Sequence, residues 1–262
     1  MKIEREKVKK VFAEYAGHYD AGDPKIHLKI LHTYKVSELC AEIAADLRKR
    51  PETLTRESVQ KDIDLAWLIG MLHDIGRFEQ VKRYHTLIDA QSVSHAALGI
   101  EILFEEGMLK RFVTAEPDDP DVEVVRAAIA YHSDYRIPND LDGRARMFCQ
   151  ILRDADKIDI FRVNCETPLE DIYHITKEEL MHAEVSEDVM KNFMQRQATP
   201  REIRKTPVDY LVGMISMAFE LVYPVSRKIA ARQGYLERLL DFPSENETTR
   251  QQFAIMKKYV NL

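Results

Sequence analysis

The stretch Leu68–Gln80 of this 262-residue chain reads LIGMLHDIGRFEQ, and the rest of the sequence is best understood from it. Its histidine, His73, lies in helical register with three preceding apolar residues, Leu65, Ile69 and Leu72. A helix over about 62–74 therefore turns this imidazole inwards. Asp74 follows directly, and Gly76 has the position of a glycine that ends a helix. A histidine and a carboxylate at the inner end of an apolar helix predict a polar site within a helical core.

Three other histidines, His32, His95 and His132, also fall among the apolar positions of predicted helices. One inward histidine is usually a core residue with a hydrogen-bond partner, and this interpretation stays open for each histidine taken alone. Burying four imidazoles without partners would be costly. A shared metal ion removes that cost, because neutral imidazole is a good ligand for transition metals. Gly99, one turn after His95, would let another segment approach that helix closely.

The acidic side chains that would complete such a site lie in ILRDADKIDIF, residues 151–161. Asp154, Asp156 and Asp159 cannot all face inwards from one helix. Periodicity leaves Asp154 and Asp156 both open as the inward carboxylate, since each is in register with a set of apolar residues. The other interpretation of this stretch is a solvated face, on which neighbouring cations pair with the carboxylates.

Helical periodicity dominates the rest of the chain, and no strand is predicted. With only 9 glycines and 10 prolines, the sequence lacks the turns of an all-β protein. We therefore predict an all-α fold in three parts, an N-terminal segment 1–23, a metal-binding helical domain 24–163, and a helical extension 164–262 packed on the same domain. The expected helices cover about 24–48, 62–74, 94–106, 122–132, 144–161, 169–183, 187–197, 207–223, 226–232 and 246–260, with a short helix and a loop over 78–93.

The composition favours a cytoplasmic protein that binds neither nucleic acid nor membranes. The formal net charge is −6, so an anionic substrate must be met by a local basic patch. The first residues are charged and lack the apolar centre of a secretory signal. The longest apolar stretch, 211–223, contains Glu220 and is short for a bilayer. The three cysteines, Cys40, Cys149 and Cys165, are far apart and are expected to be reduced.

Taken in order, these residues resemble the HD-domain superfamily of metal-dependent phosphohydrolases. The resemblance is carried by His32 in HTYKV, the doublet His73-Asp74, and an aspartate in the sequence LRDADKID. In that family the last aspartate lies in an Ala-Asp-Lys context, which selects Asp156 over Asp154. His95 and His132 extend the order to H…HD…H…H…D, which resembles the two-metal branch. The resemblance thus implies an HD-domain helical bundle over about 24–163, with additional C-terminal helices.

The resemblance also implies a ligand set and a reaction. His32, His73, Asp74 and Asp156 would hold one divalent transition metal, such as Mn, Fe, Co or Ni. In the two-metal branch Asp74 would bridge to a second ion held by the remaining two histidines, and a metal-activated water would cleave a phosphate ester. Arg77 and Lys157 lie near proposed ligands, and we expect them to assist catalysis by contacting phosphate. Surface salt bridges are the alternative for both. The charged residues Arg83, His85 and Asp89 could line the substrate entrance or have no role.

Two other functions share this ligand pattern. Some HD-fold proteins resemble mixed-valent di-iron oxygenases, and His and Asp ligands do not separate iron from Mn or Ni. A non-enzymatic HD binding or regulatory module is the third interpretation, against which the complete ligand set argues. The expected substrate is a nucleotide or another small phosphorylated molecule. HDIGRF departs from the acidic continuation of alarmone hydrolases, and no Gly-Tyr-Pro element of cyclic-di-GMP phosphodiesterases follows the domain.

Overall fold

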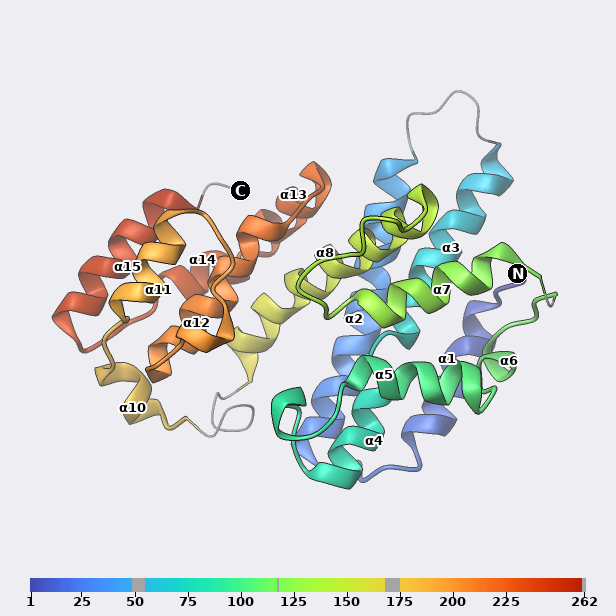
Figure 1. The fold of residues 1–262 in the computed structure, drawn as a ribbon, viewed down its shortest axis with the longest axis horizontal. Helices are drawn as coiled ribbons and strands as arrows, with labels where there is room; N and C mark the ends of the chain where they lie inside the picture. Colours follow the sequence, from blue (N-terminus) through green and yellow to red (C-terminus); the bar gives the residue numbers. More distant parts are fainter. Residues whose placement is uncertain (49–54, 117, 168–174, 261–262) are drawn as a thin grey trace. The chain divides into compact units, whose positions relative to one another are not determined.

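The chain folds almost entirely into helices. The computed structural model describes residues 1–48, 55–116, 118–167 and 175–260, and it is 72% helical. Within those ranges the β-structure amounts to a single bridge between Lys2 and Thr114. The all-α prediction is therefore confirmed. The chain divides into two compact units, Met1–Ala155 and Asp156–Leu262, and the division falls inside one continuous helix, α8 (Figure 1).

The first unit contains the segments that carry the histidines. Helices α2 and α3 pack side by side, as do α4 and α5, and α7 packs on both α3 and α5 (Figure 1). The elements in chain order are α1 (Arg5–Ala16), α2 (Pro24–Leu47), α3 (Arg56–Leu72), α4 (Ile75–Tyr84), η1 (Asp89–Gln91), α5 (His95–Ile100), a π-helical turn η2 (Glu101–Glu105), α6 (Leu109–Phe112), α7 (Pro120–Tyr131) and the start of α8 (Gly143–Glu166).

Local sequence signals explain where the site-bearing helices begin. The side chain of Asp23 accepts a hydrogen bond from the Lys25 N–H, and Pro24 occupies the first turn of α2. Ser94 caps α5 in the same manner, through the N–H of Ala97, and this fixes His95 as the first residue of that helix. The chain therefore enters α5 with an imidazole in its first turn.

Gly70 brings α2 and α3 close together. A Cβ placed on Gly70 would lie 2.6 Å from the Cα of Ser37 in α2, a distance that real structures do not tolerate. The crossing of the two helices therefore requires a residue without a side chain. It sets the spacing between His32, five residues before Ser37, and His73, which directly follows α3.

The prediction that Gly76 ends a helix is wrong. Helix α3 ends at Leu72, and Gly76 lies in the first turn of α4. A Cβ on Gly76 would lie 2.6 Å from the backbone nitrogen of Gly99 and closer still to the carbonyl oxygen of His95. Gly76 thus permits close packing of α4 on α5. The expectation that a segment approaches α5 closely at Gly99 is confirmed, and the segment is the start of α4.

The second unit is also helical. Helix α12 packs against α10, α11 and α14, and α15 packs against α11 and α14 (Figure 1). Of the helix expected over 169–183, residues 169–174 lie outside the described ranges, and the described part forms α10. After α8 the elements are α10 (Lys177–His182), α11 (Glu187–Met194), η3 (Arg201–Ile203), α12 (Pro207–Ser216), η4 (Met217–Glu220), α13 (Pro224–Gln233), α14 (Tyr235–Leu240) and α15 (Glu247–Tyr259).

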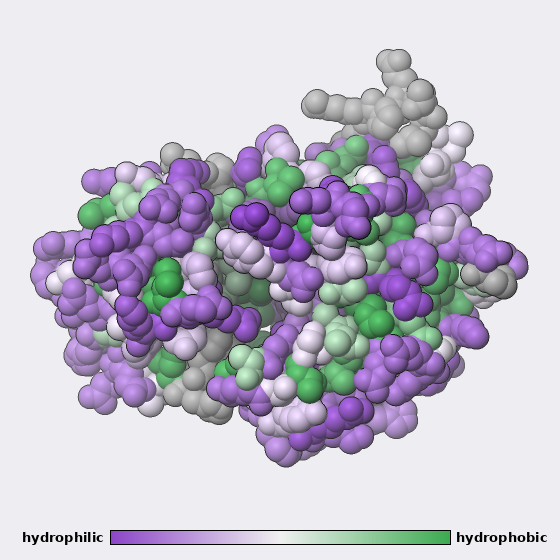
Figure 2. All heavy atoms as spheres, viewed as in Figure 1, coloured by the Kyte–Doolittle hydropathy of each residue, from purple (hydrophilic) through white to green (hydrophobic). Residues whose placement is uncertain are grey.

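The surface is mostly hydrophilic. Figure 2 shows one face on which apolar residues are scattered among polar ones and form no broad continuous patch. Among the described residues, no helix combines the length and the apolar character that crossing a membrane requires. In the ranges that the structure describes, the large apolar side chains that are exposed are Leu31, Tyr84, Tyr135, Val222, Ile255 and Tyr259.

Candidate metal centre

The residues singled out from the sequence come from separate helices, and most of them lie at helix ends. His32 lies within α2 and Asp156 within α8, whereas His95 begins α5. His73 directly follows α3, Asp74 directly precedes α4, and His132 directly follows α7. Asp74 and the four histidines are buried. A side chain at the end of a helix is not confined to the directions set by the helical repeat. Side chains from several helices can therefore converge on one point.

The Asp74 carboxylate lies at the centre of this convergence. Its Oδ2 atom lies 3.6 Å from the Nε2 atom of His32 and 3.5 Å from that of His73. Its Oδ1 atom lies 3.5 Å and 3.9 Å from the Nε2 atoms of His95 and His132. These separations are longer than a hydrogen bond, and they suit an ion lying between nitrogen and oxygen. Each carboxylate oxygen therefore faces its own pair of imidazoles.

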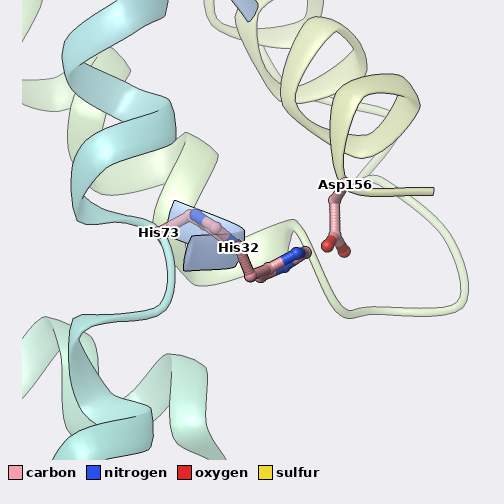
Figure 3. Close-up of side chains that lie close together, drawn as sticks. All are labelled: His32, His73 and Asp156. Carbon is pink, nitrogen blue, oxygen red and sulfur yellow. The ribbon is translucent and has the colours of Figure 1, made fainter. Parts of the chain in front are cut away.

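The side chains form two groups that could each hold a metal ion. His32, His73 and Asp156 make up the first group, and Asp74, His95 and His132 make up the second. Within each group the candidate ligand atoms lie within 4.8 Å of one another. Figure 3 shows the two imidazoles of the first group beside the Asp156 carboxylate. We call these groups the first and second positions; Asp74 belongs to the second, and its carboxylate also faces the imidazoles of the first.

The groups include Asp156 and not Asp154, among the residues that the structure describes. Asp154 accepts a hydrogen bond from Gln150, one turn earlier on α8 (2.9 Å). Asp156 is the first residue past the division between the units, but it continues the same helix. The earlier part of α8 is fixed inside the first unit by Arg144, which donates to Asp62 at 2.7 Å and Asp121 at 2.8 Å.

Hydrogen bonds on the outer ring nitrogens assign the tautomers of three histidines. The Nδ1 atom of His73 donates to the carbonyl of Gly70, and that of His132 donates to the carbonyl of Ile129, both at 2.7 Å. The Nδ1 atom of His95 donates to the Asp89 carboxylate, also at 2.7 Å. With the proton on Nδ1, each Nε2 atom carries a lone pair that faces Asp74. This is the tautomer that a metal ligand needs.

The lone pairs on the Nε2 atoms of His95 and His132 point towards each other. The Nε2 atoms of His95 and His132 lie only 2.9 Å apart. If both rings carry their proton on Nδ1, neither Nε2 atom can donate to the other. A cation at this point would satisfy both lone pairs and the adjacent Oδ1 atom of Asp74. The donor set of the second position therefore fits a bound metal ion.

The ionisation of the site also suits a metal. Burial lowers the pKa of His95, and nearby Arg77 lowers it further, so the ring stays neutral. Burial alone would raise the pKa of Asp74, but Lys29, His73 and Arg77 outweigh it and hold that pKa well below its ordinary range. Asp89 behaves similarly, since its hydrogen bond to His95 and the charge of Arg77 lower its pKa despite burial. The site thus combines a neutral His95 imidazole with the ionised carboxylates of Asp74 and Asp89.

Arg77 makes several contacts on the protein side. Its guanidinium donates to the side chain of Gln80 at 2.6 Å, to the carbonyl of Leu87 at 2.8 Å and to Asp89 at 2.7 Å. Its Nε atom also lies 3.6 Å from Oδ1 of Asp74. Arg77 therefore joins the central carboxylate to the segment before α5. The prediction that it contacts phosphate stays a prediction.

The other charged residues named from the sequence lie in different surroundings. The ammonium of Lys157 lies 3.3 Å from the Glu220 carboxylate within the second unit. Arg83 pairs with Glu79 on the surface of α4 at 2.8 Å. His85 is exposed and ends α4 with a left-handed backbone, at φ 56°. These contacts do not test a role for any of the three in substrate binding.

The sequence interpretation missed one cation at the centre of the site. The ammonium of Lys29 lies 2.6 Å from Oδ2 of Asp74, closer than either histidine of the first position. Lys29 is largely buried and precedes His32 by three residues on α2. Residues three apart share a helix face, so this spacing was the available signal.

Comparison with known proteins identifies one match. The family model described as HD domain matches residues 30–163, slightly more than half of the chain. All six residues of the two positions lie within this range. No curated protein and no solved structure matches the chain in the corresponding searches.

Proposed function

Because the chain belongs to the HD domain family, we propose that it is a metal-dependent phosphohydrolase that uses two divalent ions at these two positions. The supporting observation is the central carboxylate, whose two oxygens each face a separate pair of imidazoles. Because one fold can host different chemistries, these side chains support the activity more strongly than membership of the family alone.

The proposed ligands are His32, His73 and Asp156 at the first position, and His95 and His132 at the second, with Asp74 bridging. When bound, divalent ions neutralise phosphate oxygens and make a water nucleophilic near neutral pH. The protein contributes two carboxylates to this set, and their charge is less than that of two divalent ions. A surplus of positive charge therefore remains for an anionic substrate.

Cationic side chains supply further attraction for phosphate. Lys29 is adjacent to the bridging carboxylate and retains some exposure, so we add it to the proposed phosphate contacts Arg77 and Lys157. The protein as a whole has a net charge of −6, which makes this local concentration of cations necessary. The proposed substrate is a nucleotide or another small phosphorylated molecule, and the proposed location is the cytoplasm.

The test is phosphate release by the full-length protein. After chelation, the protein should release no phosphate from a panel of nucleotides and small phosphomonoesters. Adding Mn²⁺, Co²⁺ or Ni²⁺ under anaerobic conditions should restore release. Turnover that requires iron and O₂ would support the oxygenase alternative. Metal-loaded protein that hydrolyses nothing in the panel would contradict the proposal.

Asp154 and Asp156 offer a matched pair for assigning the first position. The two carboxylates lie two residues apart on α8, and only Asp156 belongs to a metal-binding group. Asp156→Asn should weaken metal binding at the first position and reduce activity by at least about tenfold. Asp154→Asn should retain both metal binding and activity if the variant folds. The reverse pattern would assign Asp154 as the ligand.

A further inference from the structure

The imidazoles of the metal centre are held in two different ways. His73 and His132 each donate from Nδ1 to a carbonyl three residues earlier in the chain. These bonds form with the preceding helix and need no other side chain. His95 begins its helix, so no helical carbonyl precedes it. Its Nδ1 atom donates instead to the side chain of Asp89, in the separate segment η1.

Asp89 is itself held by side chains from α4. Its Oδ1 atom accepts hydrogen bonds from Arg77 at 2.7 Å and from Gln80 at 2.9 Å. The Gln80 side chain is fully buried and also donates to Ser92 and to the carbonyl of Val93. One carboxylate oxygen of Asp89 thus binds α4, while the other binds His95. The carboxylate is fixed before any ligand arrives.

This arrangement determines which nitrogen His95 presents to the site. An ionised carboxylate only accepts hydrogen bonds, so it keeps the proton of His95 on Nδ1. The Nε2 lone pair then faces Oδ1 of Asp74 at 3.5 Å. Without Asp89 the ring could take the other tautomer or rotate, and Nε2 would lose its fixed direction. Hydrogen-bond partners of ligating histidines are worth about 10–100-fold in metal affinity.

We propose that Asp89 is a positioning residue for the second metal position and decides whether the protein holds one ion or two. This inference rests on the proposed two-metal function. Arg77 and Gln80 act through Asp89, because they fix the carboxylate that orients His95. The first position does not depend on Asp89, since His73 is held by its own backbone and His32 lies on α2.

The experiment counts metal ions in the full-length protein. Wild type, Asp89→Ala, Asp89→Asn and Asp140→Ala are stripped with a chelator and titrated with Co²⁺ by calorimetry, and bound cobalt is counted by elemental analysis. Asp140 is an exposed carboxylate on a loop of the same unit, so its removal controls for the lost charge. Wild type and Asp140→Ala should bind two ions. Asp89→Ala should bind one ion at the wild-type affinity and lose affinity for the second by about 10–100-fold.

The asparagine variant separates positioning from folding. Asn retains an oxygen that accepts from Nδ1, so Asp89→Asn should hold the second ion with an affinity between those of wild type and Asp89→Ala. Thermal melts of the metal-free proteins provide the second readout: both variants should still unfold in one cooperative transition, at a temperature lowered by the hydrogen bonds that Asp89 loses to Arg77 and Gln80. If both variants keep the wild-type affinity for the second ion, the inference about Asp89 is overturned and the hydrolase proposal stands. If Asp89→Ala loses both ions equally, the inference about Asp89 is likewise overturned and the hydrolase proposal stands. Wild-type protein that binds no ion would overturn both proposals.

Discussion

The two metal positions are built from different kinds of structure. The imidazoles of the first position come from α2 and from the end of α3, helices of 24 and 17 residues that cross tightly at Gly70. The second position depends on the start of α5, a helix of six residues that continues into a π-helical turn. Long packed helices fix these side chains by burial and, for His73, by a hydrogen bond to a carbonyl of the same helix. The start of a short helix needs an additional hydrogen bond, which Asp89 provides for His95.

This difference indicates an order of strength between the positions. The two imidazoles of the first position should be in place whenever the α2–α3 pair is folded. The second also requires the segment 86–93 between α4 and α5 to be in place, which Arg77 and Gln80 secure by hydrogen bonds to Asp89 and to backbone carbonyls of the segment. We therefore expect the first position to bind metal more tightly.

Replacing the shared carboxylate should disable both positions at once. Asp74→Ala removes the oxygen that faces each pair of imidazoles. Hydrolysis should fall by about a thousandfold or more, because metal ions contribute several kcal/mol to stabilising the transition state. Metal titration should show weaker binding at both positions. Loss of only one ion would mean that Asp74 belongs to one position and does not bridge.

Substitutions at Gly70 and Gly76, where two pairs of helices pack closely, allow the geometry of each metal position to be disturbed separately. Gly70→Ala forces the α2–α3 crossing apart beside the first position, and Gly76→Ala forces α4 away from α5 beside the second. Overpacking of this kind costs about 1–3 kcal/mol, so both variants should melt at lower temperature. Gly70→Ala should weaken the first ion more, and Gly76→Ala should weaken the second ion more.

Gly143 is the matched control for these substitutions. A Cβ at Gly143, at the start of α8, would meet no atom within 4 Å. Gly143→Ala should therefore leave stability and metal binding unchanged, or raise stability slightly. If Gly70→Ala and Gly76→Ala behave like this control, the close crossings do not set the site geometry.

The smallest expected effect concerns the cation beside the first position. The Lys29 ammonium contacts Oδ2 of Asp74 and would repel a metal ion bound to the same oxygen. Lys29→Met should raise metal affinity at the first position by about tenfold and leave the second nearly unchanged. It should also lower the melting temperature of the metal-free protein, since Asp74 would lose its nearest counter-charge.

Lys35→Met is the control, because Lys35 is an exposed lysine on the same helix. It removes the same charge without touching the site. Equal affinity changes in the two variants would indicate a general charge effect and no local competition at Asp74.

The sequence predicted the regular parts of the fold well. The helix expected over about 24–48 forms as Pro24–Leu47, because an aspartate cap and a first-turn proline mark its start. Helix α3 begins at Arg56, six residues before the expected Asp62. Its early turns are polar, and its cap, Thr55, was the remaining signal. Helix α1 was not predicted, although Val8, Val11, Phe12 and Tyr15 have helical spacing.

The role of Gly76 and the hydrogen bond between Asp89 and His95 could not be predicted from the sequence. A glycine after an apolar helix resembles a helix end, yet Gly76 serves the packing of α4 on α5. Only tertiary structure distinguishes these two uses, because both follow from the absent side chain. The convergence of six side chains followed from periodicity and family resemblance together. The link from Asp89 to His95 could not be predicted, since Asp89 lies in a segment without a regular period.

The most direct test of the central claim is anomalous X-ray diffraction from crystals of the full-length protein grown with Mn²⁺. We predict two anomalous peaks on either side of Asp74, one beside His32 and His73 and one beside His95 and His132. Each peak should lie about 2.0–2.5 Å from its ligand atoms, with one Asp74 oxygen bound to each ion. A single peak that Asp74 does not ligate, or peaks away from these histidines, would contradict the account.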